Sequence, residues 1–443
     1  FPTFPEPEHG KTWFLPWQWE LTEIGNDKVS LKMEIQDTID YPYHPGKFNN
    51  GITEVRCTSI ITLERGKTSF ELEHSLENTK QQAVTLEYWT CTTLAPGSEP
   101  GNTYTPGNSE IIAPIDHVYL KDDWWGWMGN AEIPAPELGS HVFEYKNLAI
   151  YDNWEDMGIA YAYPDITGGY YGVINHENSE GVFRVADNAG TTPGMKFWTW
   201  GAQQGLNANP QDFYENARPY IELWSGLSTQ FFEDASLAPN ELLSWTETYL
   251  PTVAMDSISL VNEHGAIHLN AVHDEADRFV AKLFMTTPDS VFELQVALNG
   301  DNTIDLYEGD FVAQSDNSSQ FTFYLDDYTV EDGEYELMAS VSNELGAQVI
   351  TCSMPVTIPF PTKGIMPARA SGPVAIRLSA DTYKLEFDEF GSRTITVFSV
   401  DGKPVDKMQI HDKSAFIRID RPGVYIILVM EGKKAYTVKI MIG

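Results

Sequence analysis

The feature that most constrains the fold is a two-residue alternation of apolar and polar residues along nearly the whole chain. It is clearest in the segments KVSLKMEIQ, ITEVRCTSIITLERG, TSFELEHSLEN and AVTLEYWTCTTL, which have strand lengths and are bounded by Gly, Asn and Pro. No segment keeps a 3.6-residue apolar period over three turns, and the nearest approach to a short helix is NPQDFYENARP. The sequence therefore predicts an all-β protein.

Composition narrows the class of protein and of partner. The chain has 443 residues, 42% hydrophobic and 21% charged, which indicates a globular protein of two to four domains. It contains no run of 18 apolar residues, so we expect no membrane-spanning segment. A net charge of −36 would repel a phosphate backbone, which argues against nucleic acid as a partner. Because no basic and apolar leader follows Phe1, we expect any signal peptide to have been removed or to lie outside this sequence.

Tryptophan marks the first domain boundary. All 12 Trp residues lie between Trp13 and Trp245, and none occurs in the rest of the chain. The aromatic-rich region closes at the segment WTETYLPT. We therefore place a first domain at residues 1–252.

Charge and turn density divide the remainder. Residues 253–358 carry 19 Asp and Glu against two basic residues, and their short strands predict an acidic immunoglobulin-like sandwich. Residues 359–370 indicate a Pro-rich linker. Residues 371–443 predict a small C-terminal β-sandwich.

One acidic segment of the second domain raises the question of a metal. The segment DNTIDLYEGD offers carboxylate oxygens of the kind that bind Ca²⁺, from Asp301, Asp305, Glu308 and Asp310. It lacks the twelve-residue loop pattern with Gly in the sixth place and Glu in the twelfth. We therefore expect a solvated acidic loop and no cofactor, with Ca²⁺ as the alternative.

The three cysteines favour neither a zinc site nor a dense disulfide framework. Their number is odd and no Cys-x-x-Cys occurs. Cys57 and Cys91 fall in strand-like segments that could be neighbours, so a disulfide between them and buried free thiols are both open interpretations.

The segment RPYIELWSG is an apolar strand with a carboxylate at its centre. Alternation puts Tyr220, Glu222 and Trp224 on one face. An ionised Glu beside apolar rings costs several kcal/mol of lost hydration unless a cation or a polar ligand reaches it. Two interpretations follow, a structural salt bridge with a cation such as Arg218, or a sugar site with ring stacking and proton transfer.

Two further clusters combine His, Asp and Trp. The first, EHGKTWFLPWQWE, contains His9. The second, DHVYLKDDWWGWMGN, contains His117, Asp122, Trp124, Trp125 and Trp127. Indole faces suit the C–H faces of sugars, while carboxylates bind hydroxyl groups. The alternative is that these Trp residues pack in the core of a large sandwich.

Several of these motifs, in this order, resemble a known superfamily. The matching segments are HGKTWFLPWQWE, SLENTKQQAVTLEYWT, GMKFWTWG and RPYIELWSGL followed by LAPNELLSWTETYLP. They are similar to the galactose-mutarotase-like superfamily, and most of all to its bacterial branch with a Trp-Thr-Trp-Gly motif. The resemblance covers about residues 8–252.

This resemblance implies a β-supersandwich with a concave sugar cleft. In the enzymes of the superfamily a late-strand Glu removes the proton of the anomeric hydroxyl, and a His protonates the ring oxygen. By position the Glu is Glu222, and the early His-Gly is His9 and Gly10. The aromatic residues near them become expected cleft walls, namely Trp89, Trp198, Trp200 and Trp224.

The sequence departs from the family pattern at the general acid. Where the mutarotases place that His after a strand pair, this chain has EYWTCTT, so Tyr88 is the nearby proton donor. An unperturbed Tyr has a pKa near 10 and suits neutral pH less well than a His. The remaining candidates for the acid are His9, His117 and His176.

A second departure concerns the strands that precede His9. Family members have several strands before the His-Gly segment, whereas His9 stands almost at the beginning of this sequence. We therefore expect the first strands to be missing, which would leave an exposed sheet edge for another strand to complete.

The C-terminal residues resemble a second family. The segments ITVFSVDGKPV and PGVYIILVMEGKKAYTVKIMIG are similar, in this order, to the sorting domain of type IX secretion cargo, over nearly all of residues 371–443. The resemblance implies the type IX secretion machinery as a partner, and a secreted or outer-surface location. A plain accessory sandwich is the alternative.

Two functional classes remain. The first is a carbohydrate-active enzyme that acts at an anomeric centre with Glu222 as base. The second is a non-catalytic glycan-binding or surface scaffold protein whose Trp and Asp residues hold sugar without turnover. A third interpretation, a purely structural Glu222, predicts a direct buried contact with Arg218, Arg184 or Lys196 and no open cleft.

Overall fold

The structure is a computed structural model. It describes residues 15–40, 51–94, 108–120, 133–154, 158–166, 168–199, 221–231, 233–273, 276–360, 374–377, 382–399, 403–419, 421, 423–431 and 434–442. Strands dominate these residues, and the helical segments among them are three single turns: α1 (Tyr145–Leu148), η2 (Tyr151–Asn153) and η3 (Leu325–Asp327). The predicted all-β class is confirmed, while the segment NPQDFYENARP lies outside the described residues. A search of the described residues found no helix with the length and apolarity needed to cross a membrane.

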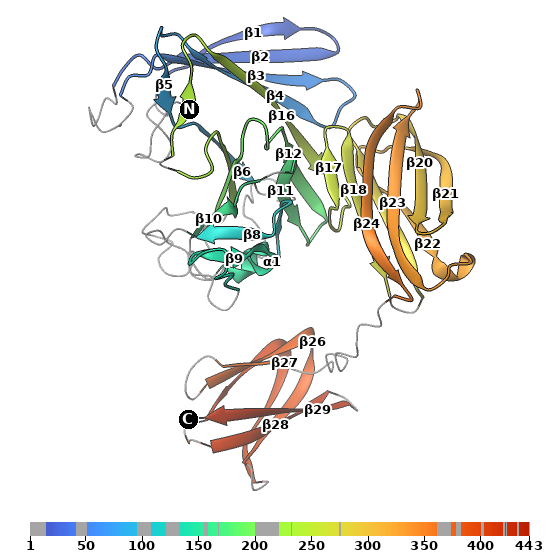
Figure 1. The fold of residues 1–443 in the computed structure, drawn as a ribbon. Coiled ribbons are helices and arrows are strands. Elements are labelled where there is room, and N and C mark those ends of the chain that lie inside the picture. Colours follow the sequence, from blue (N-terminus) through green and yellow to red (C-terminus); the bar gives the residue numbers. More distant parts are fainter. Residues whose placement is uncertain are drawn as a thin grey trace. The chain divides into compact units, whose positions relative to one another are not determined.

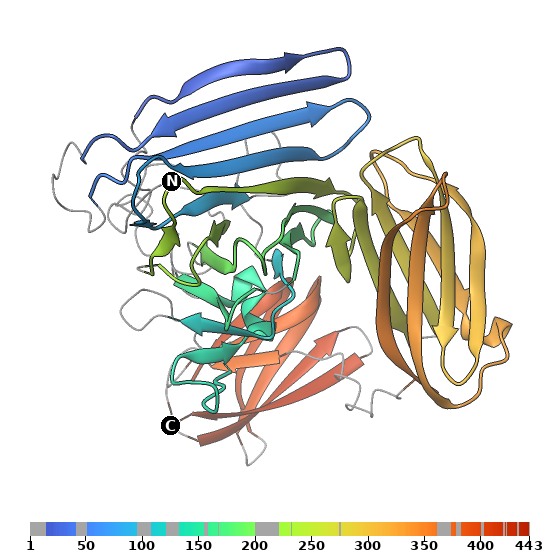
Figure 2. The same cartoon turned by 45° about the horizontal axis from the view of Figure 1, so that its top comes forward.

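An antiparallel eight-stranded sheet forms the first layer of the N-terminal sandwich (Figure 1). In sheet order its strands are β1 (Gln18–Ile24), β2 (Lys28–Gln36), β3 (Val55–Glu64), β4 (Phe70–Asn78), β16 (Leu242–Thr252), β12 (Glu180–Val185), β11 (Tyr170–Asn175) and β7 (Glu110–Ile112). Figure 2 shows β1 along the outer edge of this sheet. All seven residues of β1 are exposed, and the Trp19 side chain is 70% exposed.

The second layer is an antiparallel six-stranded sheet. In sheet order its strands are β6 (Trp89–Leu94), β14 (Ile221–Gly226), β13 (Gly194–Thr199), β10 (Gly158–Tyr163), β8 (His117–Leu120) and β9 (Val142–Glu144). A small pair, β5 (Val84–Leu86) with β15 (Ala235–Leu237), lies beside the two layers. Buried residues of both sheets, among them Ile111, Val173, Phe197 and Leu223, form the core between the layers.

Alternation explains why the first strands form a two-faced sheet. In β2 the residues Val29, Leu31 and Met33 share one face, and their cross-strand partners in β3 are Leu63, Ile61 and Ser59. The strands predicted from KVSLKMEIQ, from TSFELEHSLEN and from the segments around them are confirmed.

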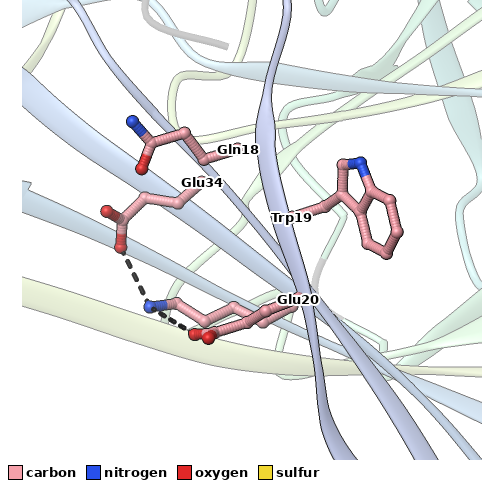
Figure 3. Close-up of a pocket in the computed structure, with 5 residues that line it drawn as sticks. Gln18, Trp19, Glu20 and Glu34 are labelled. Carbon is pink, nitrogen blue, oxygen red and sulfur yellow. Dashed lines mark ion pairs between the residues drawn. The ribbon is translucent and has the colours of Figure 1, made fainter.

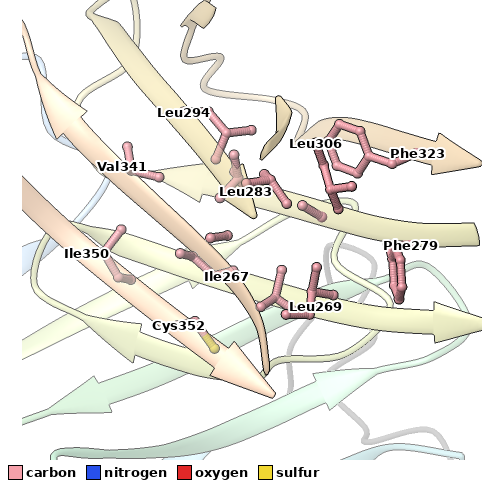
Figure 4. Packing of buried hydrophobic residues seen from close by; sticks show 14 of the residues in the cluster. Ile267, Leu269, Phe279, Leu283, Leu294, Leu306, Phe323, Val341, Ile350 and Cys352 are labelled. Atoms are coloured by element: carbon pink, nitrogen blue, oxygen red, sulfur yellow. The ribbon is translucent and has the colours of Figure 1, made fainter. Parts of the chain in front are cut away.

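A second sandwich follows, made of two antiparallel four-stranded sheets. One holds β17 (Leu260–Asn262), β18 (Gly265–Val272), β19 (Arg278–Met285) and β22 (Ser319–Tyr324). The other holds β21 (Thr303–Val312), β20 (Val291–Asn299), β23 (Gly333–Asn343) and β24 (Gln348–Ile358). The inner faces of the two sheets share one apolar core, which includes Leu269, Leu283, Leu294 and Val341 (Figure 4).

The two sandwiches belong to one compact unit, Phe1–Phe360, and share an apolar interface. Tyr170, Phe183 and Leu250 of the first sandwich cluster with Val261 and Phe284 of the second. Backbone contacts reinforce the interface, because the Thr68 N–H donates to the Thr286 carbonyl at 2.9 Å. The two sandwiches are therefore joined both by apolar packing and by backbone hydrogen bonding.

The second compact unit is Pro361–Gly443. Its described strands are β25 (Val374–Arg377), β26 (Thr382–Ser399), β28 (Gly423–Glu431) and β29 (Lys434–Ile442) in sheet order, with β27 (Pro404–Arg418) paired to β26. Leu385, Ile395, Ile417, Ile427 and Val429 lie in its own buried core. This unit therefore has the apolar interior that independent folding requires.

Candidate functional site

Glu222 lies in β14, a strand enclosed within the six-stranded sheet by β6 and β13. Every residue of β14 is buried. Ile221 and Leu223 point into the core between the two sheets. Glu222 and Trp224 occupy the opposite face, where a separate cluster of buried aromatic side chains lies.

Strand register sets the neighbours of Glu222 on this face. Across the sheet, Glu222 is paired with Thr93 of β6 and with Trp198 of β13. The next row of the same face pairs Trp224 with Lys196. Lys196 and Glu222 are therefore diagonal neighbours on adjacent antiparallel strands, a relation in which residues lie about 7–8 Å apart at the backbone.

Trp224 contacts both charged side chains. Its indole Nε1–H donates a hydrogen bond to Oε2 of Glu222 at 2.9 Å. The Lys196 Nζ lies 3.8 Å from the centroid of the Trp224 ring and 3.9 Å from that of the Phe231 ring. Lys196 has no exposed surface. The ammonium group is thus held between two aromatic rings, in the geometry of a desolvated cation–π contact.

Trp89 lies over the part of this face where Gly194 and Gly226 leave no side chains. Cβ atoms added at Gly226 would lie 2.5 Å from ring atoms of Trp89, and at Gly194 such an atom would lie 2.7 Å from the same ring. The two glycines therefore allow the indole to lie against the strands. Phe231 packs edge-on against this indole, with ring centroids 4.9 Å apart.

The three Trp residues of this face do not line an open cleft. Trp89, Trp198 and Trp224 are only 6%, 7% and 3% exposed, and Glu222 is 6% exposed. The reason is local packing, since Phe231 and Tyr161 fill the space between the rings. The resemblance implied that these rings line an open sugar cleft, but in this structure the face is closed.

The two described His candidates lie away from Glu222. His117 pairs with Tyr163, so counting strands and residues across the sheet places its backbone about 20 Å from that of Glu222. His176 follows β11 in the other sheet, where its Nε2 lies 2.7 Å from Oε2 of Glu110. The structure therefore does not bring either His to the Glu222 carboxylate.

The other predicted site residues lie outside the described residues. This holds for His9, Asp122, Trp124, Trp125, Trp127 and Trp200, and also for Arg218. Of the cations proposed for a structural pairing, Arg184 belongs to a different cluster, whereas Lys196 shares the face of Glu222.

A second buried polar cluster joins four strands of the eight-stranded sheet. Arg184 Nη2 of β12 donates to Oε1 of Glu247 of β16 at 2.8 Å, and both side chains are almost completely buried. Trp245 and Tyr249 donate to the same carboxylate at 3.0 Å each. His74 of β4 lies beside it, with Nε2 at 3.8 Å from Glu247 Oε1.

His74 connects this pair to β3. Its Nδ1 lies 2.9 Å from the Ser59 Oγ and 3.3 Å from the Tyr88 hydroxyl. The order of Ser59, His74 and Glu247 resembles a nucleophile, base and acid, but all three are buried within the sheet packing. We therefore regard this cluster as structural, because the Glu247 carboxylate is engaged by Arg184 and lies 3.8 Å from His74 Nε2, too far for a hydrogen bond.

Burial and charge shift the ionisation of this cluster. Burial raises the pKa of Glu247, but the Arg184 charge and its hydrogen bond outweigh burial and bring that pKa to about 2. Burial lowers the pKa of His74 to about 4, and the attraction of Glu247 only partly opposes it. The cluster is therefore a buried ion pair beside a neutral imidazole.

Neither a disulfide nor a metal cluster occurs among the described residues. Cys57, Cys91 and Cys352 form no disulfide. No group of three His, Cys, Asp or Glu in the described parts of the chain is placed to hold a metal ion. Asp305, Glu308 and Asp310 lie exposed on β21. The Ca²⁺ alternative stays a prediction.

Two of the hollows in the described surface lie near the β1–β2 edge of the first sandwich. One holds about 160 Å³ at the β1–β2 edge, where Lys32 pairs with Glu34 at 3.2 Å and with Glu20 at 3.8 Å (Figure 3). Trp19 points to the other side of β1 from these charges. The neighbouring hollow, of about 410 Å³, is lined by residues of the same edge. Neither hollow includes Glu222.

The sequence named Lys196 only as one of three candidate cations for a structural Glu222, and it gave Phe231 no role. The signal for Lys196 is its place in GMKFWT, where a cation occupies a strand whose every other residue is apolar or small. Phe231 follows the strand in a turn and carries no such signal.

No protein-family model matches the chain, and no curated protein matches it. Its structural neighbours include galactose mutarotase-like proteins. One is a galactose mutarotase-like protein from Clostridium acetobutylicum, 13% identical, with a TM-score of 0.37 over 57% of this chain and 73% of that one.

Two further solved structures are similar. A galactose mutarotase related enzyme from Lactobacillus acidophilus is 9% identical, with a TM-score of 0.33 over 55% of this chain and 74% of that one. A TPR-domain containing protein from Parabacteroides distasonis is 14% identical, with a TM-score of 0.42 over 57% of this chain. The match spans about a third of that protein's length, 36%.

Proposed function

We propose that this chain is an exported carbohydrate-interacting protein whose sugar site is the aromatic face around Glu222. One observation carries the proposal: a buried carboxylate shares one sheet face with three indole rings and receives a hydrogen bond from one of them. Aromatic rings beside a carboxylate are the side chains that recognise the C–H faces and hydroxyl groups of a pyranose. In this proposal Glu222 is the base at an anomeric centre.

The position of the described His residues favours a second candidate, a non-catalytic glycan-binding protein. His117 is about 20 Å from Glu222 by strand count, and His176 pairs with Glu110. Without an acid beside the base, sugar would bind without exchange of its anomers. Because the aromatic face is buried, ligand entry in either case must uncover indole rings, so binding should alter tryptophan fluorescence.

Glu222→Gln separates these candidates. We expect the wild type to speed anomer exchange of at least one sugar in a panel of mono- and oligosaccharides, followed by ¹H NMR. The variant should be about a hundredfold slower, because a positioned base contributes at least that factor, while fluorescence-detected binding changes little. Glu110→Gln is the matched control, since it alters a carboxylate paired with His176 in the other sheet, and it should keep both properties.

Other outcomes decide against the enzyme. Binding by the wild type and by Glu222→Gln without exchange in either would establish the glycan-binding candidate. Binding by neither, together with a large loss of stability in Glu222→Gln, would leave Glu222 with a structural role only.

We also propose that residues 371–443 direct export through the type IX secretion machinery. The separate compact unit with its own apolar core supports this, because a sorting domain must fold independently of its cargo. In a bacterium that carries this machinery, the full chain should reach the cell surface or the medium, and a chain ending at residue 360 should stay in the periplasm. Periplasmic export of both to the same extent would contradict the proposal. The control is a strain without the translocon, in which both chains should be retained.

A further inference from the structure

Lys196 is the buried cation of the aromatic face. It has no exposed surface and lies on β13 among residues that are all buried. Removing an ammonium group from water is costly, so a chain retains a Lys at such a place only where its charge is compensated. Here the compensation includes the faces of Trp224 and Phe231, at 3.8 and 3.9 Å from Nζ.

Trp224 links this cation to the carboxylate. Its ring face receives the ammonium group and its Nε1–H donates to Glu222 Oε2. A cation on the face of an indole withdraws electron density from the ring, which makes the N–H a stronger donor. A stronger donor and a nearby positive charge both favour the ionised form of the carboxylate that they face.

We propose that Lys196 is a positioning residue for Glu222, which it holds ionised and correctly oriented by acting on it through Trp224. The inference rests on the proposed function for its purpose, since a base must be ionised before it can accept a proton. Its physical content, a coupling between Lys196 and the proton equilibrium of Glu222, is independent of any sugar. The alternative is that Lys196 only fills space between two rings.

The test follows the indole N–H signal of Trp224 in ¹H–¹⁵N spectra of the full chain as pH is lowered. Trp224→Phe identifies the signal, and Glu222→Gln shows which of its pH-dependent movements belongs to Glu222. Lys196→Met keeps the length and apolar stem of the side chain. In this variant we expect the midpoint of the Glu222-dependent movement of the Trp224 signal to shift to higher pH by about one unit or more. In Lys196→Arg, which keeps the charge, the midpoint should stay near that of the wild type.

Two results would overturn the proposal. An unchanged midpoint in Lys196→Met would overturn the proposal, and so would an equal shift in Lys196→Met and Lys196→Arg, which would trace to packing. Should Lys196→Met not fold, Lys196→Gln provides the second measurement, because it removes the charge that lies over Trp224 and keeps a polar end on the side chain. A midpoint that rises in this variant supports the coupling, and an unchanged one overturns it. Because no sugar enters this titration, its result is separate from that of the anomer-exchange experiment.

Discussion

Replacing Arg184 with Met is expected to lower the free energy of unfolding by about 3–5 kcal/mol, because it leaves the Glu247 carboxylate buried without its cation. Trp245 and Tyr249 would still donate to Glu247, but neutral donors do not replace a full charge in a site without exposed surface. Urea unfolding followed by tryptophan fluorescence measures this, since all 12 Trp residues lie between Trp13 and Trp245.

Two further variants make the experiment specific. Arg65→Met is the matched control, because Arg65 pairs with Asp27 at 3.6 Å with both side chains largely exposed. It should change stability by well under 1 kcal/mol. The double variant Arg184→Met, Glu247→Gln should recover part of the loss, since it removes the second charge of the pair. A loss in Arg184→Met no greater than in Arg65→Met would mean that water reaches the cluster.

Acid should destabilise the first sandwich between about pH 6.5 and pH 4 through His74. The unfolded chain protonates this imidazole near 6.5, whereas burial holds the pKa in the folded protein at about 4. The unfolded state therefore binds more protons across this window, and the free energy of unfolding falls as pH falls, by about 3 kcal/mol in total. Below this window Glu247 continues the trend, because its pKa is lowered from 4.5 to about 2 and its stabilisation is lost as pH falls through that range.

His74→Asn should flatten the upper part of this dependence. Asn can place a polar atom where Nδ1 meets Ser59 and Tyr88, but it does not titrate. Unfolding free energies measured from pH 7 to pH 4 should therefore lose about 1.4 kcal/mol of slope per pH unit near the middle of the window. The exposed His264 provides the control, His264→Asn, which should keep the wild-type slope. His268, whose pKa is lowered by burial in the second sandwich, contributes in the same direction and is unaffected by either change.

The fold was largely predictable because strand formation depends on local alternation. The strands at 28–36 and 70–78 follow from patterns within a few consecutive residues, and the structure confirms them. The short turn α1 was not predicted, since four residues carry no helical period. The pairing of strands that are distant in sequence decides the rest of the fold, and no local pattern predicts that pairing.

The candidate site was predictable in part, for the same physical reason. Glu222 was conspicuous because a carboxylate interrupts a buried strand, and its alternation partner Trp224 follows directly. That Lys196 lies against Trp224 depends on the register of two strands 28 residues apart, which sequence does not determine. Arg184 and Glu247 meet across 63 residues for the same reason, although each is a charged residue at a buried strand position.

The closure of the aromatic face was not predictable at all. It depends on Phe231, a residue of a turn, reaching back over Trp89 and Trp224. A charged residue at a buried strand position is a signal that marks Lys196, Arg184 and Glu247. Phe231 carries no such signal.

The shared apolar interface couples the first two sandwiches mechanically. Tyr170 and Phe284 lie in one buried cluster across the junction, and the Thr68–Thr286 backbone bond ties the two parts at another point. Bending at the junction would have to break this apolar packing and the backbone bond, so both oppose it. A force that acts on the second sandwich would therefore reach the first sandwich through these contacts.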